Sequence, residues 1–197
     1  MTDQTLQQKP MGLMTYPAEG WRRWMFKAPL TLWRLGLGPL IGQYLIVITA
    51  TGRKSGLPRH TMTEYHTLPN GRPVVPCAFG ERAQWYKNIQ ADPLVTIQTA
   101  DGAESVRARR ITANDELLTA YQLIRRRNPV MLQWYLDSLG VQSDPDDVVA
   151  KKDRVVFITF DPTDKPTPPP LETDLTWVWW VLGVLLFLNL FGPRRRD

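Results

Sequence analysis

The distribution of apolar and polar residues along the chain predicts about six short strands. Each is a run of β-branched or alternating apolar residues bounded by Gly, Pro, Asn or Asp. Asn70-Gly71 separates the second run from the third, and this dipeptide supplies the positive φ that tight hairpin turns require. The predicted strands are QYLIVITA (43–50), PRHTMTEYHTL (58–68), PVVPCAF (73–79), LVTIQTA (94–100), ESVRARRIT (104–112) and RVVFITFD (154–161).

Apolar residues spaced three to four apart predict helices between these strands. Asn114 is the expected N-cap of one helix, which has acids in its first turn and arginines in its last, as the helix dipole favours. The strand connections are too short for a parallel sheet, whose crossovers need a dozen or more residues. The pattern therefore predicts a small α+β barrel with interspersed helices. The predicted helices are 21–40 (interrupted or restarted at Pro29), 81–92, 114–127 and 129–140.

The C-terminal part of the chain has a different character. Residues 161–174, DPTDKPTPPPLETD, are rich in Pro and acids and predict an extended, semi-rigid linker. Residues 175–192, LTWVWWVLGVLLFLNLFG, carry no charged side chain and are apolar on every side of a helical wheel. Such a helix spans about 27 Å, close to the roughly 30 Å hydrocarbon layer. We predict a C-terminal transmembrane helix, the alternative being a buried helix or a dimer contact.

The predicted organisation has five parts. They are a disordered N-terminus (1–18), a globular domain (19–160), the linker (161–174), the membrane-anchor helix (175–192) and a basic tail (193–197). The N-terminus lacks the basic start and apolar run of a signal peptide, which predicts that the globular domain lies on the cytoplasmic side of a membrane. Arg194–Arg196 favour the cytoplasm as well, so the orientation of the tail is left open.

Composition and charge exclude several classes of protein. The single cysteine, Cys77, rules out an internal disulfide, and two histidines, His60 and His66, are too few for a histidine-based metal site. The net charge is +5, and no acidic residue occurs between Glu19 and Glu64. A segment this cationic needs an anionic partner, a lipid surface or solvent. Nucleic acid is not expected as a partner, because no recognition motif accompanies the charge.

The turn TGRKSG concentrates positive charge between two predicted strands. Gly52 and Gly56 allow the backbone to bring amide N–H groups close to a ligand. Arg53 offers a planar fork of donors, Lys54 a movable charge and Ser55 a hydroxyl group. This chemistry suits a phosphate or a carboxylate, although the turn by itself also fits a solvated basic hairpin.

Two separated stretches, LIVITATGRKSGLPR and WYKNIQADPLVTIQ, resemble the deazaflavin-dependent nitroreductase family in their motifs and in their order. The resemblance covers residues 25–125 and implies a split β-barrel, similar to that of flavin-binding oxidoreductases. It also implies binding of the deazaflavin coenzyme F420, whose tail carries a phosphate and a glutamate chain. Plain core packing is the alternative for Trp85, and a helix-end cap is the alternative for Asn88. The positions that match the family's cofactor contacts are Thr51, Gly52, Arg53, Lys54, Ser55, Gly56, Arg59, Trp85 and Asn88.

The chain also departs from the family pattern. The family's longer Gly-rich loop before Trp85 is reduced here to GERAQ, so Phe79 and Gly80 are candidates to replace its cofactor contacts. Glu64 stands where many members have apolar residues, and we expect it to face solvent. In the helix that carries the family's substrate-side tyrosines only Tyr135 is left, and it is the candidate catalytic residue.

These observations predict a membrane-anchored oxidoreductase that transfers a hydride from reduced F420 to an apolar acceptor, such as a quinone or a nitro compound. No grouping of Ser, His, Asp or Cys indicates nucleophilic catalysis. The alternatives are a non-catalytic cofactor- or lipid-binding module at the membrane, and a reductase that holds FMN or haem instead. His60 and His66 are the conceivable haem ligands. A homodimer is left open.

Overall fold

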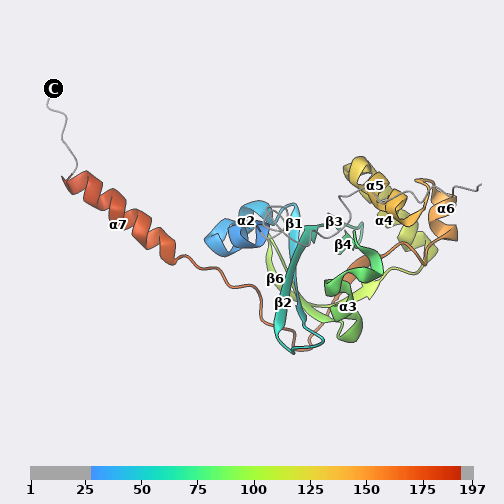
Figure 1. Cartoon of the computed structure of the whole chain (residues 1–197), viewed down its shortest axis with the longest axis horizontal. Coiled ribbons are helices and arrows are strands. Elements are labelled where there is room, and N and C mark those ends of the chain that lie inside the picture. Colours follow the sequence, from blue (N-terminus) through green and yellow to red (C-terminus); the bar gives the residue numbers. More distant parts are fainter. Residues whose placement is uncertain (1–27, 192–197) are drawn as a thin grey trace, which may run out of the picture.

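The computed structural model describes residues 28–191, which form one antiparallel seven-stranded sheet with helices packed against it and a last helix, Thr176–Phe191, that projects away from it (Figure 1). The sheet order is β2-β1-β5-β6-β7-β4-β3. The predicted disordered N-terminus and basic tail lie outside the described residues. The strands are β1 (Leu45–Thr51), β2 (Pro58–Glu64), β3 (His66–Thr67), β4 (Pro73–Pro76), β5 (Leu94–Thr99), β6 (Gly102–Arg110) and β7 (Phe157–Pro162).

The predicted split β-barrel of about six strands is wrong. The run over 58–68 is interrupted at Tyr65, whose amide donates to the carbonyl of Tyr44 and whose hydroxyl donates to the carbonyl of Gly42. This residue keeps the end of β2 beside β1, while the next residues, β3, pair with β4. As a result β2 and β3 form the two edges of the sheet, and among the described residues no ladder joins these edges. The sheet is open, and it has seven strands.

The helices follow the predicted positions more closely than the predicted ends. Asn114 is not the N-cap of α4, because Ala113 holds that position and the Asn114 side chain accepts a hydrogen bond from Lys152. Gly140, with φ +66°, ends α5 as predicted. The helical elements are η1 (Trp33–Leu37), α2 (Gly38–Ile41), η2 (Gly80–Arg82), α3 (Gln84–Ala91), α4 (Asn114–Arg127), α5 (Pro129–Leu139), α6 (Pro145–Ala150) and α7 (Thr176–Phe191).

Alternating side chains of β1 separate two faces of the sheet. Ile46 and Ile48 belong to a buried cluster that includes Tyr86 and Ile89 of α3. Val47 points to the opposite face, where it packs with Trp33 of η1 and with Leu171. A second large cluster lies between β4, α4, α5 and α6. We call the first face of β1 the α3 face and the second the η1 face.

The Pro-rich segment is extended as predicted, but it is fastened to the sheet. The side-chain amide of Gln98, on β5, accepts from the backbone N–H of Leu171 at 2.7 Å and donates to the carbonyl of the same residue at 3.1 Å. Thr167 bonds to the hydroxyls of Thr96 and Ser105. Residues 163–174 therefore form a strap across the η1 face, and we keep this name for them.

The predicted transmembrane helix and membrane localisation are contradicted. Helix α7 has 16 residues, which corresponds to about 24 Å. A span of the hydrocarbon layer takes about 20 apolar residues. None of the helices described between residues 28 and 191 is long and apolar enough to cross a membrane. At the start of the helix, the carboxylate of Asp174 accepts from the amide and the hydroxyl of Thr176. The predicted contact of this helix with membrane lipid is therefore not supported either.

Candidate functional site at the β1–β2 turn

The cationic turn connects β1 to β2 and closes on itself through backbone hydrogen bonds. The amide of Gly52 donates to the carbonyl of Leu57 at 2.9 Å, and the amide of Gly56 donates to Gly52 at 2.8 Å. A Cβ atom at Gly52 would lie 2.7 Å from Oγ of Ser55 and 3.1 Å from the carbonyl oxygen of Leu57, so this position has no room for a side chain. Gly56 has φ +67°, a conformation that favours glycine. The two glycines of the sequence therefore stand where the tight turn leaves no room for a side chain or requires a positive φ.

Arg53 braces the turn against helix α3. Its Nη1 donates to Oδ1 of Asn88 at 2.8 Å, and its Nη2 donates to Oε1 of Gln84 at 2.8 Å. The backbone amide of Arg53 also reaches Oδ1 of Asn88 at 3.4 Å. Asn88 is 7% exposed, so its amide is held in place by the surrounding core. The two motifs that are separated in the sequence thus meet in the structure.

Gln84 is a residue of this brace that sequence reasoning missed. It stands four residues before Asn88 on α3, a spacing that puts both side chains on one face of the helix. That spacing was the one signal available, because the partner Arg53 is 31 residues away along the chain.

Lys54 and Arg59 are the cations left to meet a ligand. Lys54 is exposed, and its side chain has no partner among residues 28–191. Arg59 gives one of its five N–H groups to Oγ of Ser55 at 3.3 Å. No acid in the described part of the chain forms an ion pair with either cation or with Arg53. The turn therefore carries uncompensated positive charge, which is the property an anion site needs.

The remaining predicted cofactor contacts lie beside α3. Phe79 and Trp85 are partly buried against the α3-face cluster, and Trp85 meets Tyr86 edge to face at 6.4 Å between ring centroids. Gly80 is buried with φ +51° and accepts a hydrogen bond from the thiol of Cys77. Burial raises the pKa of Cys77 to about 12, so this thiol stays protonated and is no nucleophile.

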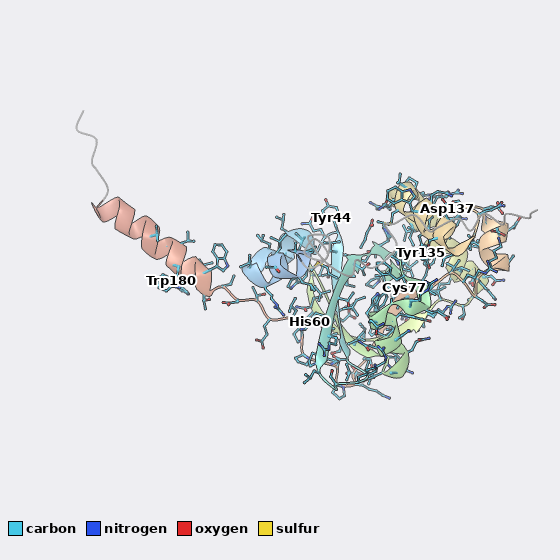
Figure 2. The ribbon with its side chains drawn as sticks, in the orientation of Figure 1. Tyr44, His60, Cys77, Tyr135, Asp137 and Trp180 are labelled. Carbon is cyan, nitrogen blue, oxygen red and sulfur yellow. The ribbon has the colours of Figure 1, made fainter. Side chains whose placement is uncertain are left out.

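Tyr135, the predicted catalytic residue, lies in the α4–α5 core (Figure 2). Its hydroxyl donates to the carbonyl of Val156 at 3.2 Å and accepts from the amide of the same residue at 2.8 Å. The ring stacks on Phe157 at 5.9 Å. Burial, chiefly, raises the pKa of Tyr135 well above its usual range. With 1% of its surface exposed, Tyr135 has no access to a substrate, and its geometry is that of a structural residue.

Glu64 does not simply face solvent as expected. Both of its carboxylate oxygens accept from the side-chain amide of Asn128, at 3.2 and 2.9 Å, and Oε1 lies 3.5 Å from Nε2 of His66. Asn128 in turn caps α5 by accepting from the amide of Met131. Glu64 therefore fastens the start of α5 to the end of β2. His66 is 9% exposed, and burial lowers its pKa.

This arrangement, an uncompensated cationic turn braced on a helix beside partly buried aromatic rings, has the charge and geometry of a site that can take an anionic ligand. A model of the F420H(2)-dependent quinone reductase family matches residues 36–138, which is more than half of the chain. The chain belongs to this family, and it is an F420-dependent oxidoreductase. The FMN alternative finds no support.

Several solved structures are similar to this chain. A structure of an F420-H2-dependent reductase (FDR-A) is 20% identical, covers 60% of this chain and 93% of its own, and has a TM-score of 0.46. The protein Atu2129 of Agrobacterium tumefaciens, of unknown function, is 17% identical, with 80% and 70% covered and a TM-score of 0.43. The conserved hypothetical protein Rv2991 of Mycobacterium tuberculosis is 13% identical, with 63% and 76% covered and a TM-score of 0.40. No curated protein matches the sequence.

Proposed function

We propose that the β1–β2 turn holds the phosphate and glutamate tail of F420, and that the enzyme reduces an apolar acceptor of the quinone class. The observation that supports the binding site most directly is the charge of the turn. Three cations stand there without an acidic partner among the described residues, and one of them is used as a brace. The quinone acceptor is supported by the family description.

The residues of the turn fit the chemistry of the tail. Lys54 offers three ammonium donors on a flexible stem, which suits a phosphate or a chain of carboxylates whose positions vary. Arg59 retains donors beyond the one it gives to Ser55. Gly52 keeps the backbone free of a side chain where the turn is tightest. An acidic residue here would repel the tail, and between Glu19 and Glu64 the sequence has none.

The protein's part in the reaction is to bind and orient. Reduced F420, when bound, supplies a hydride. Lys54 and Arg59 neutralise its tail, and the partly exposed rings of Phe79 and Trp85 provide an apolar surface next to the turn's brace. Neither Cys77 nor Tyr135 exchanges a proton at neutral pH, because burial raises the pKa of both groups. We therefore assign the proton that completes reduction of the acceptor to solvent.

Helix α5 is the proposed contact for the acceptor. Val130, Met131 and Trp134 stand exposed on this helix, with 60%, 39% and 40% of their surfaces accessible. Exposed apolar side chains that cluster on one helix are typical of a binding surface. The start of the helix is fixed by Asn128, which both caps α5 and holds Glu64. An apolar, uncharged acceptor suits this surface better than a charged one.

A binding titration tests the proposal. F420 quenching or enhancement of protein fluorescence is measured for the wild type, for Lys54→Ala and for Arg107→Gln. Arg107 is an exposed arginine on β6, which is separated from β1 by β5 in the sheet, and serves as the matched loss of one charge. We expect saturable F420 binding that Lys54→Ala weakens by about tenfold and Arg107→Gln leaves unchanged. An equal loss of F420 affinity in both variants would refute the assignment of the turn, because it would show only a general attraction between the positively charged protein and F420.

A further inference from the structure

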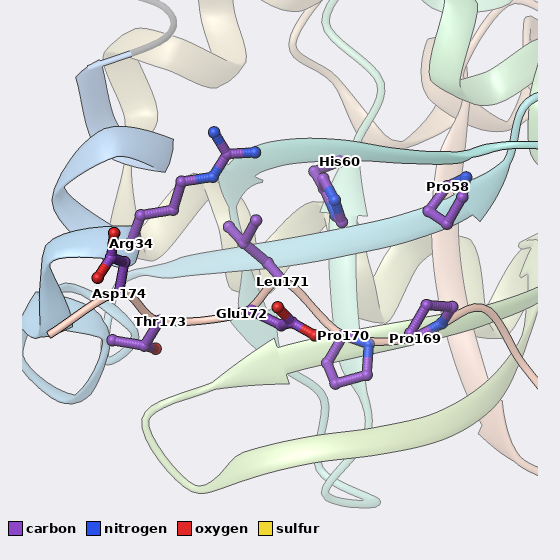
Figure 3. A pocket seen from close by; sticks show the side chains of 9 residues that line it. All are labelled: Arg34, Pro58, His60, Pro169, Pro170, Leu171, Glu172, Thr173 and Asp174. Carbon is purple, nitrogen blue, oxygen red and sulfur yellow. The ribbon is translucent and has the colours of Figure 1, made fainter. Parts of the chain in front are cut away.

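We propose that a hollow on the η1 face is a second ligand site, one that takes a small aromatic carboxylate. The hollow has a volume of about 610 Å³ and lies between η1, β2 and the strap (Figure 3). A volume of this size is ordinary for small-molecule sites. The lining residues are Arg34, Pro58, His60 and the strap residues 169–174.

The hollow is separate from the turn that is proposed to hold F420. On β2, His60 pairs with Thr49, and Thr49 has the same orientation as Val47, on the η1 face. The brace of the turn reaches α3, which packs on the opposite face. The strap and Arg34 lie outside residues 36–138, so most of the lining is not part of what the family match covers, although Pro58 and His60 are.

The walls of the hollow are fixed before any ligand arrives. The imidazole Nδ1 of His60 is 2.9 Å from the hydroxyl of Thr49, which is fully buried. The strap is held by the two bonds between Gln98 and Leu171. The amide of Asp174 donates to the carbonyl of Arg34 at 2.7 Å, which joins the end of the strap to η1. A preformed site loses little entropy when it binds a ligand.

The lining carries one cation, Arg34, and two acids, Glu172 and Asp174, so a negative group would have to bind at Arg34, which forms an ion pair with neither acid among the described residues. The side chain of Arg34 extends from η1 toward β2 and has no hydrogen-bond or ion-pair partner in the described part of the chain (Figure 3). The carboxylate of Asp174 is engaged in capping α7. Glu172 is the other acid of the lining, and it would repel a dianion more than a monoanion. The site therefore suits a carboxylate rather than a phosphate.

The apolar part of the lining favours an aromatic body. Pro58, Pro169 and Pro170 present rigid hydrocarbon rings to the hollow, next to the side chain of Leu171. Flat apolar surfaces of this kind match an aromatic ring, whereas a short aliphatic acid would leave these apolar surfaces exposed to water. A benzoate-like molecule with its carboxylate on Arg34 and its ring against the prolines uses both features.

His60 reports on the site directly. Burial, and second the charge of Arg34, lower the pKa of His60 below its usual value. A carboxylate bound beside the imidazole favours its charged form, so it should raise this pKa. The whole chain has two histidines, and His66 lies in the other core, against Val74. The C2–H proton resonances of the two rings therefore give a signal and an internal control in one NMR spectrum.

The experiment titrates the full chain with benzoate, acetate and inorganic phosphate. We expect benzoate to shift the His60 resonance saturably and to raise the His60 pKa, with no change at His66. Acetate and phosphate should bind at least about tenfold more weakly, since each lacks one of the matched features. Arg34→Gln should weaken benzoate by about tenfold or more, and Arg107→Gln should not.

Several results would overturn the inference. They are the absence of a saturable shift, equal shifts at both histidines, equal affinity for the three anions, and unchanged benzoate binding in Arg34→Gln. Arg34 is exposed and its guanidinium makes no described bond, so its replacement should leave the fold intact. An unchanged His66 resonance verifies that point. Loss of F420 binding through the turn would not affect any of these outcomes, because the two sites are tested with different probes.

Discussion

Replacing Asn88 by Ala tests whether the brace between the turn and α3 matters for both stability and binding. The substitution removes the acceptor of the Arg53 guanidinium at 2.8 Å and of the Arg53 amide at 3.4 Å. Asn88 is nearly buried, whereas Gln84, the other end of the brace, is exposed. Water can therefore replace the hydrogen bond of Arg53 to Gln84 more readily than the one to Asn88.

The magnitude follows from the type of bond. A hydrogen bond to a charged group contributes about 1.5–3 kcal/mol, and the exposed Arg53 can recover part of this from solvent. We expect Asn88→Ala to lower the free energy of unfolding by about 2 kcal/mol, and Gln84→Ala by less than about 1 kcal/mol. If binding F420 must then order the turn again, affinity falls by at most the same free energy, which corresponds to about 30-fold.

Urea unfolding followed by tryptophan fluorescence gives the stability, and an F420 titration gives the affinity. Lys54→Ala separates the two effects, because it should weaken binding and leave the unfolding midpoint unchanged. An Asn88→Ala protein that unfolds at the wild-type urea concentration and binds F420 with wild-type affinity would refute the brace. Equal destabilisation by Gln84→Ala would show that burial is not what gives the Asn88 bond its strength.

Four further substitutions and a pH series have defined outcomes. Gly52→Ala should weaken F420 binding more than Gly56→Ala, because a methyl group at Gly52 meets Ser55 at 2.7 Å whereas Gly56 faces open space and costs only about 1–2 kcal/mol for its positive φ. Burial lowers the pKa of His66 below its ordinary 6.5. The unfolded chain then binds more protons, so stability should be fully present above about pH 6.5 and fall below it, and His66→Asn should flatten this profile in urea unfolding. Tyr135→Phe should cost about 1–3 kcal/mol of stability and leave kcat for quinone reduction unchanged.

The sequence predicted the strands well and the closure of the sheet badly. Runs of β-branched residues between turn signals are local features, and every predicted run overlaps an observed strand. The break at Tyr65 depends on two bonds to the residues around Gly42 and Tyr44, which lie about twenty positions earlier. No local pattern encodes such contacts. The same holds for the strap, since its composition predicts an extended chain but not that Gln98 holds it to the sheet.

The site shows the same division between local and tertiary information. The turn's glycines and cations were evident from the residues, because a tight cationic turn is specified within six positions. The residues alone could not show that the guanidinium of Arg53 donates its hydrogen bonds to Asn88 and Gln84. Tyr135 was predicted to be catalytic from its helical position alone. That position did not reveal that its hydroxyl forms hydrogen bonds with the backbone carbonyl and amide of Val156.

Three cations in one motif therefore do not contribute three equivalent contacts. Arg53 connects the turn to α3, and its planar fork meets two acceptors that a lysine could not hold at once. Arg59 donates one hydrogen bond to Ser55, and the side chain of Lys54 has no partner among the described residues. In the site we propose, a rigid guanidinium fixes the turn and a flexible ammonium would meet the anion, which is the arrangement expected where a ligand tail is long, charged and variable in shape. Exchanging the two, with lysine at 53 and arginine at 54, should keep the charge and lose the brace.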